Sequence, residues 1–65
     1  MKVKYITVLD FEVGEVFQYE VNESDIAFDE GEYYEDFLIE RGHNLNNIEW
    51  MVHNEPTVRR MYFTN

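Results

Sequence analysis

The chain contains no cysteine, a single proline and only five lysine and arginine residues in 65 amino acids. Without cysteine it can form no disulfide and carry out no thiol chemistry. It also has no apolar run approaching the roughly 20 residues that a membrane-spanning helix needs. These absences predict a small, soluble protein of the cytoplasm, with no membrane partner.

A strong excess of negative charge accompanies a high apolar content. Fourteen Asp and Glu residues give a formal net charge of −9, while 45% of the residues are hydrophobic and 17% are aromatic. This apolar content is too high for a disordered acidic tail. Since 65 residues suffice for one domain only, we expect residues 1–65 to fold as a single acidic domain.

Two strand-like segments open the chain. Residues 2–9 and 15–21 are rich in β-branched and aromatic side chains. Gly14 suits the left-handed position of a bulged turn, which predicts a hairpin in which Leu9 faces Phe17.

This predicted register divides the hairpin into two faces. We expect the helix of the domain to cover the face that carries Tyr5, Phe17 and Tyr19. The opposite face would leave apolar side chains uncovered, and these form a candidate homodimer surface: Ile6, Val8 and Val16.

A helix is predicted over residues 30–41. Asp29 and Glu32 have the spacing of a capping box, and apolar side chains recur at helical intervals after them. Gly42 stands where a left-handed residue commonly ends a helix.

The last third of the chain favours two further strands. Residues 48–52 alternate in polarity, Pro56 marks a turn, and residues 57–64 are rich in β-forming side chains. A second helix over 45–53 fits part of the same pattern and stays as the alternative. The predicted fold class is α+β: a small ββαββ domain with a four-stranded antiparallel sheet and one helix packed on one face.

The acidic residues are concentrated in the middle of the chain. No lysine or arginine occurs between positions 10 and 40, whereas this span holds twelve acids. Glu32, Asp36 and Glu40 recur every four residues along one face of the expected helix, where like charges cost a few tenths of a kcal/mol per pair. A protein that tolerates this repulsion can use the resulting field to attract a partner, although acids of this kind also serve solubility alone.

In size, charge and absence of cysteine the chain resembles the small phage-encoded inhibitors that imitate DNA. The resemblance implies a non-enzymatic inhibitor or modulator that occupies a basic site on a nucleic-acid-handling or defence protein, in the host cytoplasm if the chain is viral. The candidate partner-binding residues lie on and just before the expected helix: Asp29, Glu30, Glu32, Tyr33, Glu35, Asp36 and Glu40. The alternative is a structural module that forms a homodimer, or joins a larger complex, through its exposed sheet face.

We expect no catalytic site, cofactor or metal. Acids are common enough here to form chance pairs, and an EF-hand loop starting at Asp25 fails because Ala27 and Glu30 stand where it needs an oxygen ligand and glycine. His43 and His53 lack the cysteine partners of a typical zinc site. We expect His43 to provide positive charge at the end of the helix and His53 to lie in a surface turn.

Direct binding of nucleic acid is also not expected. Arg59 and Arg60 are too few to attract phosphates to a chain of charge −9. We expect them to pair with acids of the same chain: Glu20, Glu40 or Glu49.

The net charge predicts that added salt stabilises the fold. Raising the ionic strength from 0.01 M to 0.15 M shortens the screening length from about 30 Å to about 8 Å, which weakens repulsion within the folded chain. We therefore expect a higher midpoint of thermal unfolding in sodium chloride, measured by circular dichroism. A lower midpoint in salt would contradict the prediction.

Overall fold

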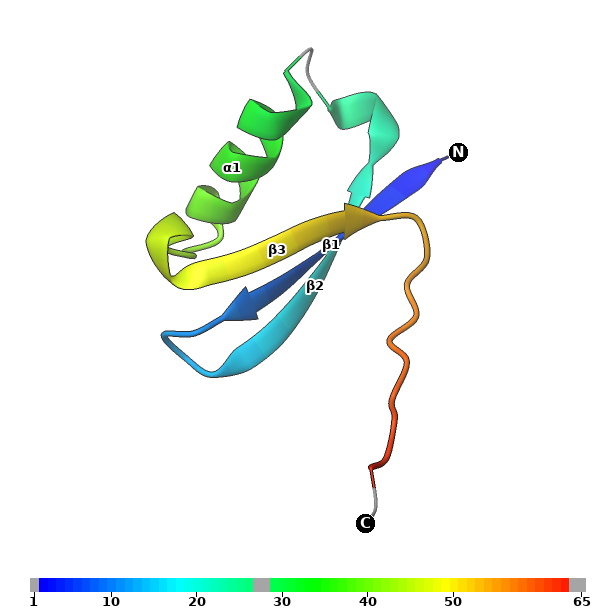
Figure 1. The fold of residues 1–65 in the computed structure, drawn as a ribbon. Helices are drawn as coiled ribbons and strands as arrows, with labels where there is room; N and C mark the ends of the chain where they lie inside the picture. The colour runs from blue at the N-terminus through cyan, green and yellow to red at the C-terminus, as the bar shows by residue number, and fades with distance from the viewer. Residues whose placement is uncertain (1, 27–28, 64–65) are drawn as a thin grey trace.

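The computed structural model describes residues 2–26 and 29–63 and shows an α+β domain with one antiparallel sheet and one helix (Figure 1). The elements are strands β1 (Val3–Asp10) and β2 (Glu15–Asn22), a 3₁₀ turn (Glu23–Asp25), helix α1 (Glu30–Glu40), a second 3₁₀ turn (Leu45–Asn47) and strand β3 (Ile48–His53). The strand order is β2-β1-β3, which places β1 in the centre. Because α1 packs on one face of this sheet, the predicted fold class is confirmed.

The β1–β2 hairpin has a register one residue away from the predicted one. Phe17 lies opposite Val8, whereas we expected it opposite Leu9. Since side chains alternate between the faces of a strand, this shift exchanges the two faces of β1 relative to β2. Ile6 and Val8 are therefore fully buried beneath α1, and their assignment to the uncovered face is wrong. Tyr5, which we expected beneath the helix, lies on the uncovered face instead.

The cause of the shift is the length of the hairpin loop. Asp10 and Glu15 form the last pair, so the loop contains four residues and not three. The carboxylate of Asp10 accepts hydrogen bonds from the backbone N–H groups of Glu12 (2.9 Å) and Val13 (3.3 Å). The N–H of Gly14, at φ 71°, donates to the carbonyl of Asp10 at 2.9 Å. The side chain at the end of β1 thus organises the loop and sets the register of the hairpin.

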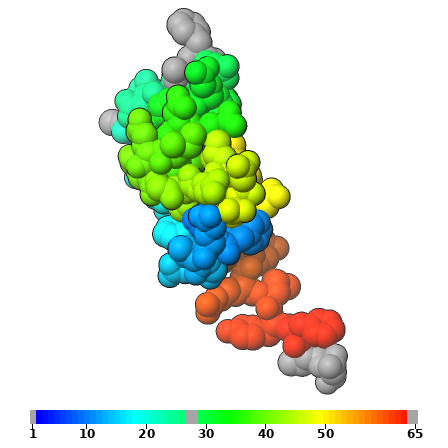
Figure 2. Space-filling view, turned by 90° about the vertical axis from the view of Figure 1, so that its left-hand side faces the viewer, coloured from blue at the N-terminus to red at the C-terminus, as the bar shows by residue number. Residues whose placement is uncertain are grey.

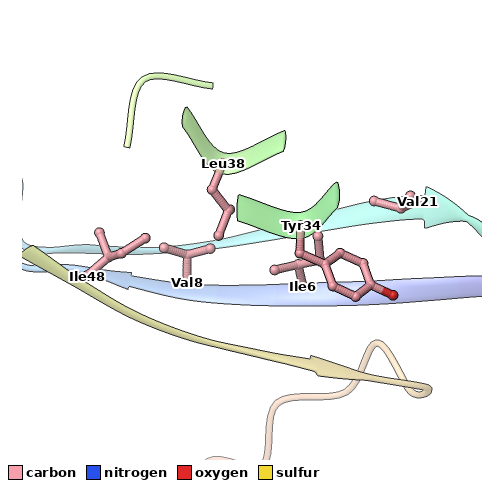
Figure 3. Close-up of a cluster of buried hydrophobic side chains, with 6 residues drawn as sticks. All are labelled: Ile6, Val8, Val21, Tyr34, Leu38 and Ile48. Atoms are coloured by element: carbon pink, nitrogen blue, oxygen red, sulfur yellow. The ribbon is translucent and has the colours of Figure 1, made fainter. Parts of the chain in front are cut away.

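The hydrophobic core lies between α1 and the sheet. Tyr34 and Leu38 are four residues apart and project from α1 toward Ile6 and Val8 of the central strand (Figure 3). Three of these side chains are completely inaccessible to solvent: Ile6, Val8 and Leu38. Phe17 and Tyr19 pack against this core, as the sequence predicted for these two residues.

Both ends of α1 carry the expected caps. The carboxylate of Asp29 accepts a hydrogen bond from the N–H of Glu32 at 3.1 Å. At the other end Gly42 adopts φ 92°, and the N–H of His43 donates a hydrogen bond to the carbonyl of Leu38 at 3.1 Å. This arrangement satisfies carbonyls that would otherwise lack partners. Among the described residues, no helix is long and apolar enough to cross a membrane.

The segment after the helix is a strand, so the alternative of a second helix over 45–53 is wrong. β3 pairs with β1 and directs Ile48, Trp50 and Val52 toward the helix. This alternation is the one predicted from the sequence.

The final predicted strand is not observed. Residues 57–63, the part of 57–64 that the structure describes, carry no strand and extend away from the sheet (Figures 1 and 2). A helix is about 10 Å wide and neighbouring strands are about 4.8 Å apart, so one helix covers about three strands. A fourth strand beyond β3 would gain little cover from α1. We refer to residues 57–63 as the C-terminal tail.

Truncating Leu38 tests the contact between α1 and the sheet. We expect Leu38→Ala to lower the free energy of unfolding by about 2–5 kcal/mol, because it leaves a cavity in the core. The control is Ile39→Ala, whose side chain is 55% exposed and whose effect should stay within about 0.5 kcal/mol. Urea unfolding followed by circular dichroism measures both, and equal losses would contradict this placement of α1.

Candidate functional site

A groove with acidic walls lies between α1 and the outer strand β2. It has a volume of about 700 Å³. It is formed by three consecutive residues of β2, one residue of the following turn, and the side of α1 nearest to them. The lining residues are Glu20, Val21, Asn22, Asp25, Asp29, Glu32, Tyr33, Asp36, Phe37, Glu40 and Arg41. We call this feature the acidic groove.

The structure gathers most of the predicted partner-binding residues in this groove. Five of the seven line it, and they share one side of the helix: Asp29, Glu32, Tyr33, Asp36 and Glu40. Glu30 and Glu35 are exposed but lie outside it. Asp25 and the edge of β2 at Glu20 form the opposite wall, and no sequence pattern predicted that these residues lie near α1.

The interior of the groove is apolar. Val21 is buried, and the rings of Tyr33 and Phe37 are half-buried and lie 6.4 Å apart. The guanidinium of Arg41 sits over the ring of Phe37 at 4.4 Å, a cation–π contact that keeps it at the end of the helix. The groove therefore combines aromatic surface with charge.

The charge of the groove is strongly unbalanced. Six acidic residues and one arginine line it, which gives a formal charge of −5; one of the six, Glu20, lies opposite Tyr5 and directs its side chain to the uncovered face of the sheet. Successive members of the Glu32, Asp36 and Glu40 series are about 6 Å apart along the helix axis. Within the described residues, none of these carboxylates forms an ion pair. Their field is therefore directed outward, toward any cation that enters the groove.

A buried polar network lies next to the groove and was not predicted. The carboxylate of Asp10 contacts Nδ1 of His43 at 2.7 Å, and Nε2 of His43 contacts the hydroxyl of Tyr19 at 2.6 Å. Asp10 and His43 are both only 6% exposed. We refer to these three residues as the His43 network.

The charge states of the network follow from the pKa values of its ends. The hydrogen bond from His43 lowers the pKa of Asp10, with further help from the N–H groups of Glu12 and Val13 and opposition from burial. Asp10 is therefore a carboxylate that only accepts, so Nδ1 of His43 carries a proton. Burial raises the pKa of Tyr19, and the charge of Asp10 adds to this against the opposite influence of Arg41. Tyr19 therefore keeps its proton, and its hydroxyl is hydrogen-bonded to Nε2 of His43.

The carboxylate, imidazole and hydroxyl of the network come from three different segments of the chain. The ring of Tyr19 also packs edge-on against Phe37 at 5.4 Å. The network is therefore a structural tie that joins β1, β2 and the end of α1. His43 was expected at the helix end for charge and capping; its backbone does help to cap α1, and its side chain contacts Asp10 and Tyr19.

Further hydrogen bonds fasten the hairpin loop to the second 3₁₀ turn. The N–H of Phe11 donates to the carbonyl of Asn47 at 3.0 Å. The carboxylate of Glu12 accepts from the side-chain amides of Asn47 (2.7 Å) and Asn44 (3.3 Å). Together with the His43 network, these contacts hold the hairpin loop against the segment that follows α1.

The uncovered face of the sheet differs from the predicted dimer surface. Of the three predicted residues only Val16 lies there, and it is 62% exposed. Thr7, at the centre of this face, contacts Nε2 of His53 at 2.5 Å and accepts a hydrogen bond from Gln18 at 3.1 Å. His53 is thus part of the sheet face and not an isolated turn residue. The face mixes these polar contacts with exposed apolar side chains, since Leu9 lies opposite Val16 and Met51 lies opposite Thr7.

No group of three or more potential ligands that could hold a metal occurs among the described residues. The expected pairing of Arg59 and Arg60 with acids of the same chain is likewise not seen in that part of the structure. Comparison of the chain with protein-family models, curated proteins and solved structures finds no match. The proposals below therefore rest on the geometry and charge of the molecule itself.

The lowered pKa of Asp10 predicts a pH-dependent contribution to stability. A carboxyl group whose pKa falls on folding stabilises the fold above its ordinary pKa of 3.8, and this contribution is lost as the pH falls through the folded value. We expect Asp10→Asn to lower the urea midpoint at pH 7. The difference from the unmodified chain should shrink as the pH is lowered below about 5.

The matched control is Glu15→Gln, which removes the same charge from the exposed residue opposite Asp10 at the end of the hairpin. It should have a much smaller effect at pH 7. A difference between Asp10→Asn and the unmodified chain that stays constant down to acid pH would show that ionised Asp10 does not stabilise the fold.

Proposed function

We propose that this chain is a non-enzymatic binding protein that inhibits or modulates a nucleic-acid-handling or defence protein by occupying its basic site. The observation that carries the proposal is the acidic groove, with six acidic residues and one arginine around an apolar interior. Half of the twelve acids between positions 10 and 40 meet there, although β2 and α1 are separate segments of the chain. Acids that served solubility alone would have no reason to converge in this way.

The density of charge supports imitation of a nucleic-acid strand. The helix side of the groove runs from Asp29 to Glu40, a length of about 17 Å at 1.5 Å per residue. Without Glu20, five carboxylates over this length give about one charge per 3.4 Å, which matches the spacing along a single strand of duplex DNA. A basic surface that binds a phosphate backbone would therefore meet a comparable charge density here.

The apolar interior supports a protein as the partner. Aromatic side chains dominate the energetics of protein interfaces, and surrounding charges mainly steer the approach of the partner. Tyr33 and Phe37 provide such anchors within the groove. Arg41 already contacts Phe37, which shows how an arginine of the partner can stack in the same environment.

The proposed partner is a basic protein of the cytoplasm, and of the host cytoplasm if the chain is phage-encoded. Direct binding to nucleic acid is not part of the proposal, because a net charge of −9 repels phosphates. No catalytic step and no cofactor are involved.

Displacement of DNA tests this function. A panel of purified DNA-binding proteins, each holding a fluorescent duplex, is titrated with the chain over a series of salt concentrations. We expect the chain to release the duplex from its target, with an affinity that falls steadily as salt rises. Neutralising the groove with Glu32→Gln and Asp36→Asn should weaken this effect by at least about tenfold, which corresponds to 1.4 kcal/mol.

The matched control is Glu30→Gln with Glu35→Gln, which removes the same number of charges from α1 outside the groove. It should stay within about threefold of the unmodified chain if the position of the charges matters more than their number. Equal losses in both variants would show that displacement depends on net charge alone and not on the groove. Displacement that does not change with salt would contradict it as well.

A further inference from the structure

The C-terminal tail exposes an unusual amount of apolar surface. Val58, Met61, Tyr62 and Phe63 are 69–90% exposed, the highest values of any large hydrophobic residues described. Single exposed apolar residues are common on protein surfaces, but several in one short segment typically mark a contact with another chain. The tail projects from the body of the domain in two perpendicular views (Figures 1 and 2).

The tail also carries local positive charge in a highly acidic chain. Arg59 and Arg60 are two of its five basic residues, and both are exposed. The tail is rich in β-branched and aromatic residues, which favour an extended strand, yet no described strand pairs with it. It therefore has the composition of a strand that lacks a partner.

The acidic groove offers the complementary features. Its strand wall is formed by Glu20, Val21 and Asn22, which are consecutive in β2. Because neighbouring residues of a strand point to opposite faces, all three can line one groove only where the edge of the strand itself is part of the wall. β2 is one of the two edge strands of the sheet, and no strand of the described residues pairs with its outer edge, which can therefore accept an added strand.

We infer that the tail of one copy of this chain binds the acidic groove of a second copy and lies along the open edge of β2. The tail has seven residues and β2 has eight, so their extended lengths match. Arg59 and Arg60 then face a groove of formal charge −5, and the apolar side chains of the tail reach Tyr33 and Phe37.

The position of the tail favours exchange between copies. The tail follows β3, which forms the opposite edge of the sheet from β2, and it runs away from the domain. If each copy donates its tail to the other, the two contacts are equivalent and the assembly closes as a symmetric dimer. The surface involved differs from the sheet face that the sequence suggested for dimerisation.

This inference does not depend on the proposed function, because it involves this chain alone. Where both hold, the tail of a second copy competes with the basic partner for the same groove. Self-association and partner binding can be measured separately, so the failure of one leaves the other open to its own test.

Sedimentation of the full chain over the micromolar range at low salt tests the exchange. We expect a dimer that dissociates as salt is added. Arg59→Glu with Arg60→Glu should raise the dissociation constant by at least about tenfold, because the altered tail is repelled by the groove. Glu32→Arg with Asp36→Arg should do the same, because it reduces the formal charge of the groove from −5 to −1 and so removes most of its attraction for the arginines of the tail.

An equimolar mixture of these two variants provides the decisive measurement. In the mixed pair the acids introduced into the tail of one variant can pair with the two arginines introduced on α1 of the other, and the second contact is unmodified. We expect the mixture to form a heterodimer with a dissociation constant within about threefold of the unmodified dimer. Circular dichroism of each variant alone checks that it folds, and Glu30→Arg with Glu35→Arg is the control outside the groove that should remain dimeric.

Three results would overturn the inference. The first is an unmodified chain that sediments as a monomer at every concentration, which includes the case of a tail bound to its own groove. The second is a dimer that withstands both sets of charge reversals, which would place the interface on another surface. The third is a mixture of folded variants that fails to associate, which would show that tail and groove do not meet.

Discussion

The carboxylate of Asp10 is the interaction on which the rest of the structure depends. It accepts hydrogen bonds from two N–H groups of the hairpin loop and from the ring of His43, which follows the end of α1. The first contacts fix the loop at four residues and so decide which face of β1 carries Ile6 and Val8. The contact with His43 fixes where the helix ends above that face. One buried charge thereby couples the register of the sheet to the position of the helix, at a site where its desolvation is offset by hydrogen bonds.

The sequence predicted the features that depend on local chemistry. Asp29, Glu32 and Gly42 marked the helix ends correctly, and the alternation of Ile48, Trp50 and Val52 identified β3. The hairpin register was wrong because three-residue and four-residue loops both suit Gly14. The choice between them depends on Asp10 and His43, which are 33 residues apart in sequence. The polarity of β1 nevertheless favoured the longer loop. A four-residue loop buries the apolar Ile6 and Val8, whereas a three-residue loop would have buried the polar Thr7.

The candidate site was predictable only on the helix. Regular spacing placed Asp29, Glu32, Asp36 and Glu40 on one side of α1. Glu20 and Asp25 join them because β2 is the edge strand that flanks this side of the helix, and edge or centre position is a property of the whole sheet. With this strand order, the charged side of α1 forms one wall of a groove and β2 forms the other. The unpaired edge of β2 is part of that second wall.

The central position of β1 has a consequence for how the protein is made. β1 precedes β3 in the chain, yet one of its edges is paired only by β3, the last strand of the sheet. Until Ile48–His53 has been synthesised, the nascent hairpin keeps a free backbone edge, and Ile6 and Val8 lack the cover of a finished domain. Free strand edges and exposed apolar side chains favour aggregation, whereas like charges on neighbouring chains oppose their approach.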